Sequence, residues 1–184
     1  MPTTELSPEA TLQLWQEEEA AVRLRMGAPG VARPEQVAGK TGLEVFQAIF
    51  DGELPSPMIG VPMDMLPIRM DHGVAIFQGR PSRTHYNPLG TVHGGWVATL
   101  LDSCVGCAVH TALPAGRSYT TVELKVNFVR AVTDQVPLVR AEGRIIHMGR
   151  SMGTAEGRLV GPDGKLYAHA STTCFIFEAP TAKG

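Results

Sequence analysis

The sequence is poor in cysteine, has no surplus of basic residues and contains no long apolar run. Three cysteines in 184 residues are too few for a disulfide framework, so we expect a reducing, cytoplasmic location. Sixteen basic residues against eighteen acidic ones give a net charge of −2, which offers no indication of a nucleic-acid partner. No apolar run reaches roughly eighteen residues, and the first twenty lack the pattern of a signal peptide. We therefore expect no membrane span and no secretion signal.

Cys104 and Cys107 form a C-x-x-C pair, the one arrangement in the sequence that suggests a metal. On a helix the two thiols lie on one face, and His110, one turn further on, supplies only a third ligand, whereas a structural zinc site takes four. Small apolar core side chains are the favoured interpretation of both cysteines. We therefore expect no metal and no bound cofactor.

Apolar periodicity and turn residues predict an N-terminal helical segment followed by a domain of the α+β class. We divide the chain into an N-terminal helical extension with a linker, residues 1–40, and one domain, residues 41–180. Helices are expected over residues 7–26, 42–51 and 95–111, and strands over residues 63–70, 74–78, 119–129, 138–148, 151–160 and 166–177. One long helix after two strands, with four further strands behind it, is typical of an antiparallel sheet packed on one helix.

The most informative stretch runs from His85 to His110 and reads HYNPLGTVHGGWVATLLDSCVGCAVH. Gly94 and Gly95 allow the backbone to approach a ligand closely. The helix that follows directs its first unpaired N–H groups at the same place, which favours an anion or a developing oxyanion. Asp102 is a lone carboxylate in this apolar helix, although Asp is a poor helix former and is rarely buried unpaired. Such a conflict with local rules is expected at a functional site.

These residues resemble, at the same spacing, the hotdog-fold acyl-CoA thioesterases, and in particular the phenylacetate-pathway (PaaI-like) branch of the 4-hydroxybenzoyl-CoA thioesterase superfamily. The resemblance rests on Asn87, on His93-Gly94-Gly95 and on Asp102, and it covers about residues 57–177. It implies a hotdog fold, in which a curved antiparallel sheet wraps around the helix from residue 95 to 111, here with extra N-terminal helices. It also implies a homodimer or homotetramer with active sites shared between subunits.

The resemblance implies a catalytic role for each motif residue, and each also has a structural explanation. Asp102 would be the nucleophile or the general base; the alternative is a solvent-facing carboxylate. The Gly94 N–H would polarise the thioester carbonyl with help from the Asn87 amide; the alternatives are a simple helix start and an Asn-Pro turn. His93 is expected mainly to fix the turn by bonding loop backbone, and general-base catalysis is its less favoured role.

Four further residues complete the expected site. Thr121 opens the long strand after the helix, and in some family members a hydroxyl here orients the hydrolytic water; a simple β preference explains the threonine equally well. Arg150, with Ser151 beside it, is a candidate to bind a CoA phosphate through bidentate hydrogen bonds, although a plain surface arginine is an equally good interpretation. Gly95 is the remaining expected substrate contact.

The sequence thus predicts an acyl-CoA thioesterase that hydrolyses an aryl or medium-chain acyl-CoA. A non-catalytic acyl-CoA-binding or sensing protein of the same fold is the alternative, and a hotdog dehydratase is disfavoured because its separate histidine–acid pairing is not seen. Gly94 and Asp102 are eight residues apart, or about 12 Å along a helix. One thioester carbonyl needs both groups within roughly 3 to 3.5 Å of its reacting atoms. We therefore expect two antiparallel helices to share the site, with strand 119–129 pairing with its own copy.

Overall fold

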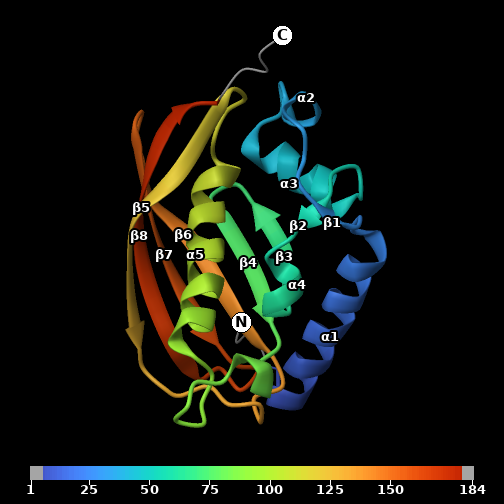
Figure 1. The fold of residues 1–184 in the computed structure, drawn as a ribbon, viewed down its shortest axis with the longest axis vertical. Helices are drawn as coiled ribbons and strands as arrows, with labels where there is room; N and C mark the ends of the chain where they lie inside the picture. Colours follow the sequence, from blue (N-terminus) through green and yellow to red (C-terminus); the bar gives the residue numbers. More distant parts are fainter. Residues whose placement is uncertain (1–5, 180–184) are drawn as a thin grey trace, which may run out of the picture.

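The computed structural model describes residues 6–179, which form a six-stranded antiparallel sheet curved around one long helix (Figure 1). The sheet has the strand order β3-β4-β6-β7-β8-β5. Its strands are β3 (Met65–Asp71), β4 (Val74–Gly79), β5 (Arg117–Phe128), β6 (Val139–Met148), β7 (Met152–Val160) and β8 (Leu166–Glu178). The helices are α1 (Pro8–Arg25), α2 (Pro34–Val37), α3 (Gly42–Phe50), α4 (Gly60–Met63) and α5 (Gly94–Thr111). The predicted α+β class, and the hotdog arrangement of a sheet around one helix, are confirmed.

The predicted helices and strands agree with the observed ones to within about two residues, and the differences lie in the linker and the loops. Residues 27–40, expected as a linker, contain the single turn α2 and the short strand β1 (Pro29–Gly30). β1 pairs with β2 (Ser56–Pro57), which lies between the predicted helix 42–51 and the predicted strand 63–70. A 3₁₀ turn, η1 (Arg83–His85), precedes the glycine motif. None of the helices within residues 6–179 combines the length and apolar character needed to cross a membrane.

Glycines in the sheet allow the helix α5 to lie close to it. A Cβ atom at Gly143 of β6 would lie 2.3 Å from the carbonyl oxygen of Cys104, and one at Gly157 of β7 would lie 2.7 Å from a methyl carbon of Val105. The side chains that α5 buries against the sheet are Trp96, Val97, Leu100, Leu101, Cys104, Val105, Ala108 and Val109. This close contact fixes the height of α5 over the sheet, and with it the height of every group that α5 carries.

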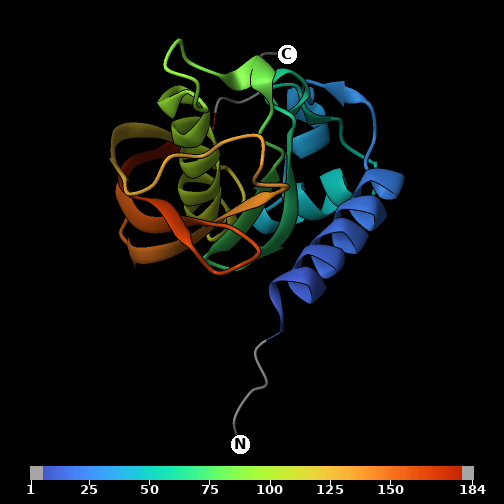
Figure 2. The same ribbon diagram turned by 90° about the horizontal axis from the view of Figure 1, so that it is seen from below.

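The N-terminal helix α1 lies outside the curve of the sheet, away from α5 (Figure 2). Its contact with the sheet combines packing with buried polar groups. The guanidinium of Arg140 on β6 lies 4.5 Å from the ring centre of Trp15 and donates to Gln78 of β4 at 2.8 Å. The Gln78 amide in turn donates to Glu19 of α1 at 2.7 Å. Because buried polar groups are costly unless paired, this matched set fixes how α1 seats on the domain.

Candidate active site

The loop before α5 ends in a cap made by His93. The Nδ1 atom of His93 accepts a hydrogen bond from the Gly95 N–H at 2.8 Å, and the His93 N–H donates to the His85 carbonyl at 2.7 Å. A Cβ atom at Gly95 would lie 2.9 Å from this Nδ1, so a side chain there would disturb the cap. The ring of His93 thus bonds backbone at the end of the loop, which favours its structural role, and general-base catalysis by His93 stays a prediction. Since the Gly95 N–H is used inside the loop, its contact with substrate stays a prediction.

The Gly94 N–H has a different environment. Gly94 is the first residue of α5, so its N–H lies too early for an intrahelical partner, and no group within residues 6–179 accepts a hydrogen bond from it. Beside it lies a pocket of about 260 Å³, whose lining includes Phe128, Arg130 and Tyr167. A Cβ atom at Gly94 would lie 3.2 Å from the Phe128 ring. An unpaired donor therefore stands at the wall of a small pocket, and its contact with a thioester oxygen stays a prediction.

Asn87 holds the loop that leads to this pocket. Its Oδ1 accepts from the N–H groups of Leu89 at 2.9 Å and Thr91 at 3.4 Å, and its Nδ2 donates to the Thr91 hydroxyl at 3.0 Å. This is the Asn-Pro turn that the sequence offered as the alternative. The turn role is what the geometry provides, and a direct bond from Asn87 to a thioester stays a prediction.

Asp102 and Thr121 lie together, 19 residues apart in sequence. Asp102 is half-buried in the middle of α5, and its Oδ1 accepts a hydrogen bond from the Thr121 hydroxyl of β5 at 3.1 Å. The carboxylate is part-buried and bonded to the sheet, which disfavours the alternative of a solvent-facing carboxylate. The direct bond was missed from the sequence, which linked Thr121 to a water molecule and not to the acid.

The groups around this pair are held neutral by burial. Burial raises the pKa of the Cys107 thiol to about 12 and also raises the pKa of the Tyr119 hydroxyl, so both remain protonated near neutral pH. Burial lowers the pKa of His110 to about 4, and its ring packs 5.2 Å from that of Phe46. Cys104 is fully buried in the core, which agrees with the apolar interpretation of the cysteines.

Arg150 and Ser151 lie at the other end of α5 from Gly94. They occupy the turn between β6 and β7, next to Gly153, whose Cβ position lies 2.9 Å from Val109 near the end of α5. Fifteen residues separate Gly94 from Val109, or about 22 Å along the helix. Within one chain the structure therefore does not bring Arg150 and Ser151 to the glycine motif. Strand β7 also begins at Met152, one residue later than predicted.

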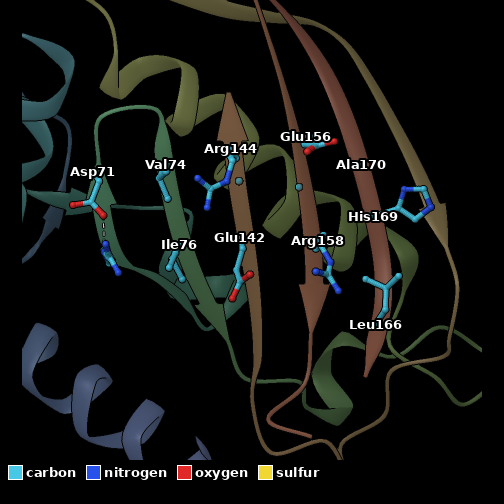
Figure 3. A pocket seen from close by; sticks show the side chains of 13 residues that line it. Asp71, Val74, Ile76, Glu142, Arg144, Glu156, Arg158, Leu166, His169 and Ala170 are labelled. Carbon is cyan, nitrogen blue, oxygen red and sulfur yellow. Dashed lines mark hydrogen bonds and ion pairs between the residues drawn. The ribbon is translucent and has the colours of Figure 1, made fainter. Parts of the chain in front are cut away.

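A separate hollow of about 870 Å³ lies on the outer face of the sheet (Figure 3). Charged side chains from neighbouring strands line it, among them Glu142 and Arg144 of β6 and Glu156 and Arg158 of β7. Opposite charges stand directly across from each other in the register of these two strands. This hollow contains no residue of the glycine motif and faces away from α5, so it is not part of the candidate site.

Known proteins resemble this chain in a region that includes the glycine motif and Asp102. A family model described as "Thioesterase superfamily" matches residues 89–168, which include Gly94, Asp102, Thr121 and Arg150. A Pseudomonas aeruginosa protein named "Putative esterase PA1618" is 32% identical over 118 residues, which cover 61% of this chain and 79% of that protein. "Putative esterase VNG_1336C" of Halobacterium salinarum is 35% identical over 75 residues, and this chain spans about half (48%) of its length.

Solved structures share the fold. A protein of Ralstonia eutropha JMP134, described as a "putative thioesterase, phenylacetic acid degradation-related protein", is 29% identical with a TM-score of 0.65, covering 71% of this chain and 98% of that one. Thioesterase HI1161 of Haemophilus influenzae aligns over 80% of this chain and 99% of its own with a TM-score of 0.64. Its identity of 16% makes this second likeness one of fold alone.

Proposed function

The chain belongs to the thioesterase superfamily, and on this premise we propose that it hydrolyses acyl-CoA thioesters to a free acid and CoA. One observation carries the proposal. A helix that begins with the unpaired Gly94 N–H also carries, two turns later, a half-buried carboxylate oriented by a hydroxyl. The first group suits a developing oxyanion, and the second suits a nucleophile or a general base.

The two groups act in one site only if two chains contribute. Gly94 and Asp102 stand about 12 Å apart on one rigid helix, which is too far for one carbonyl. A second α5 running antiparallel would place its Gly94 beside this Asp102, and the reverse, in a two-fold dimer. Strand β5 supports this dimer, since among residues 6–179 it pairs with β8 alone and exposes 60% of Val122 and 59% of Phe128. A homotetramer built from such dimers is compatible with the same proposal.

The proposed chemistry uses these groups in order. The Gly94 N–H donates to the thioester oxygen as it becomes an oxyanion, a contact typically worth on the order of 3 kcal/mol. Asp102 either attacks the carbonyl carbon or removes a proton from the attacking water. In the first case the C–S bond breaks, the CoA thiolate leaves, and water then hydrolyses the mixed anhydride to release the acid and regenerate Asp102, with the proton passing to the thiolate. Because Thr121 donates to Oδ1, the other carboxylate oxygen is left for the reacting atom. In the water mechanism the hydroxyl adds to the carbonyl carbon, the C–S bond breaks, and the CoA thiolate takes up the proton. The proposal uses no metal and no further cofactor.

Substrate binding divides between two ends of the site. The pocket beside Gly94 suits an apolar part of the substrate, and Arg130 in its lining is a candidate for a CoA phosphate. Arg150 and Ser151 lie too far from the Gly94 of their own chain to share a site with it. In the proposed dimer they serve the site that contains the Gly94 of the other chain. An aryl or medium-chain acyl group remains the proposed class. CoA thioesters and three free cysteines together favour a cytoplasmic location.

An acyl-CoA sensor that binds without cleavage is the alternative. The bond between Asp102 and Thr121 argues against a sensor, since pure binding has no use for an oriented carboxylate at this point. The test is incubation of the protein with a panel of acyl-CoA thioesters and a thiol reagent. Thiol released in many-fold excess over protein supports the enzyme, and stoichiometric binding without release supports the sensor.

A further inference from the structure

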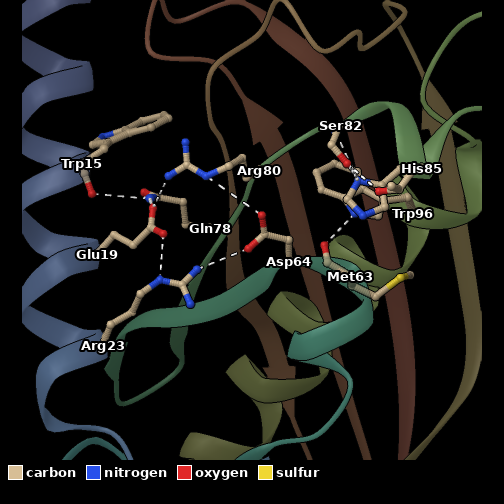
Figure 4. Close-up of polar contacts among 11 residues, drawn as sticks. Trp15, Glu19, Arg23, Met63, Asp64, Gln78, Arg80, Ser82, His85 and Trp96 are labelled. Carbon is tan, nitrogen blue, oxygen red and sulfur yellow. Dashed lines mark hydrogen bonds and ion pairs between the residues drawn. The ribbon is translucent and has the colours of Figure 1, made fainter.

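Trp96, two residues after Gly94, is held on three sides. Its indole N–H donates to the Met63 carbonyl at 2.8 Å, and the ring of His85 stacks on it with centroids 5.2 Å apart (Figure 4). On a third side the indole packs against the backbone of Gly79, where a Cβ atom would lie only 2.9 Å from the ring. Only 3% of Trp96 is exposed. Trp96 therefore ties the first turn of α5 to the Met63 carbonyl.

Met63 is followed by a residue in an unfavourable backbone conformation. Asp64 has φ 42° and ψ 55°, and among residues 6–179 it is the one non-glycine residue with positive φ. L side chains rarely adopt this region, so surrounding contacts have to maintain it. The Asp64 carbonyl accepts from the Arg80 N–H at 3.0 Å, and its carboxylate accepts from Arg23 at 3.3 Å.

Arg23 brings α1 into this arrangement. Its Nε donates to Glu19 at 2.9 Å, and Glu19 is only 7% exposed and bonded to the buried Gln78 (Figure 4). The guanidinium is therefore held between a buried anchor on α1 and the strained Asp64. A continuous set of contacts runs from the N-terminal helix through Asp64 and Met63 to Trp96.

We propose that α1 is a positioning element for the amino end of α5, acting through Arg23 and Asp64 on the Met63 carbonyl and Trp96. The helix α1 lies outside residues 89–168, which match the superfamily model. The match therefore assigns no role to the N-terminal extension, whereas this proposal does. The effect on turnover rests on the proposed thioesterase function. The effect on the indole does not, and it is measured separately.

The structural arm of the test observes the indole directly. The chain has two tryptophans, so an ¹H–¹⁵N spectrum contains two indole signals, and Trp96→Phe identifies which belongs to Trp96. Arg23→Ala should shift the Trp96 signal and speed its hydrogen exchange by about fivefold or more. Arg23→Lys should restore the wild-type signal in part. The control is Leu24→Ala, one residue further on, where the side chain is 87% exposed, and it should change neither signal. An unchanged Trp96 signal in folded Arg23→Ala overturns the proposal.

The kinetic arm is a double-mutant cycle on residues that do not touch. Arg23→Ala and Trp96→Phe should each lower kcat by about fivefold with KM within about twofold, since both misdirect the same N–H. In the Trp96→Phe background, Arg23→Ala should have little further effect. If kcat of the double variant falls by the full product of the two single reductions, the proposal is overturned. Absence of turnover in the wild type refutes the proposed function, and the indole signal then decides this inference alone.

Discussion

Replacing Thr121 by valine removes one hydroxyl at nearly constant shape and isolates the bond to Asp102. The bond is 3.1 Å long and half-buried, and its acceptor is a carboxylate oxygen. Hydrogen bonds to charged groups contribute about 1.5 to 3 kcal/mol, and a tenfold change in rate corresponds to about 1.4 kcal/mol. If the bond orients Asp102 for reaction, kcat of Thr121→Val should fall by about 10- to 100-fold.

The assay for Thr121→Val is steady-state thiol release with the best acyl-CoA of the panel. KM should remain within about twofold of wild type, because the hydroxyl faces the carboxylate and not the bound substrate. Thr121→Ser is the matched control, since it keeps the hydroxyl and should retain most of the activity. If Thr121→Val turns over within about twofold of wild type while remaining folded, the threonine is there for β geometry and the reasoning fails.

Three further predictions use other parts of the molecule. Arg150→Ala should raise KM for acyl-CoA severalfold and leave kcat unchanged. Equal KM values in initial-rate assays would favour the alternative interpretation of Arg150 as a plain surface residue. Gly143→Ala should lower the free energy of unfolding by about 1 to 3 kcal/mol in urea, because the new Cβ lies 2.3 Å from the Cys104 carbonyl oxygen; an unchanged midpoint would contradict the close packing of α5. The pKa of His110 is lowered from 6.5 to about 4 by burial, so the unfolded state binds the proton first, and stability should fall as pH drops from 6.5 toward 4. His110→Gln should remove this fall in the free energy of unfolding between pH 6.5 and 4. An equal pH dependence of the free energy of unfolding in the wild type and the variant would refute the prediction.

The sequence was sufficient for the parts of this fold that depend on local pattern. The alternation of apolar residues predicted β5, and the spacing of apolar residues predicted α5, which buries one face against the sheet. In β5 the ladder shifts register between Thr121 and Glu123, and Val122 is 60% exposed, which the alternation did not predict. The cap at His93 and the turn at Asn87 also depend only on neighbours within four residues. Such short-range features can be predicted without knowing the topology.

Contacts between distant segments could not be predicted in the same way. The bond between Asp102 and Thr121 requires the register of β5 against α5, and the space for α5 requires Gly143 and Gly157 to lie beneath it. Single glycines in strands gave no sign of which helix they would meet. The contact of Arg23 with Asp64 spans 41 residues and depends on how α1 seats on the sheet, which composition does not encode.

The shared active site is the central claim, and mixing two inactive chains tests it most directly. Asp102→Asn removes the charge with little change of shape, and should reduce turnover at least about a hundredfold. Gly94→Pro removes the N–H at the first position of α5, where proline fits a helix, and should be similarly inactive. After subunit exchange, a mixed dimer has one site with both lesions and one with neither. Because half of randomly paired dimers are mixed, about a quarter of wild-type activity should return. If mass spectrometry confirms mixed dimers of folded chains and no activity returns, the two groups do not act across subunits.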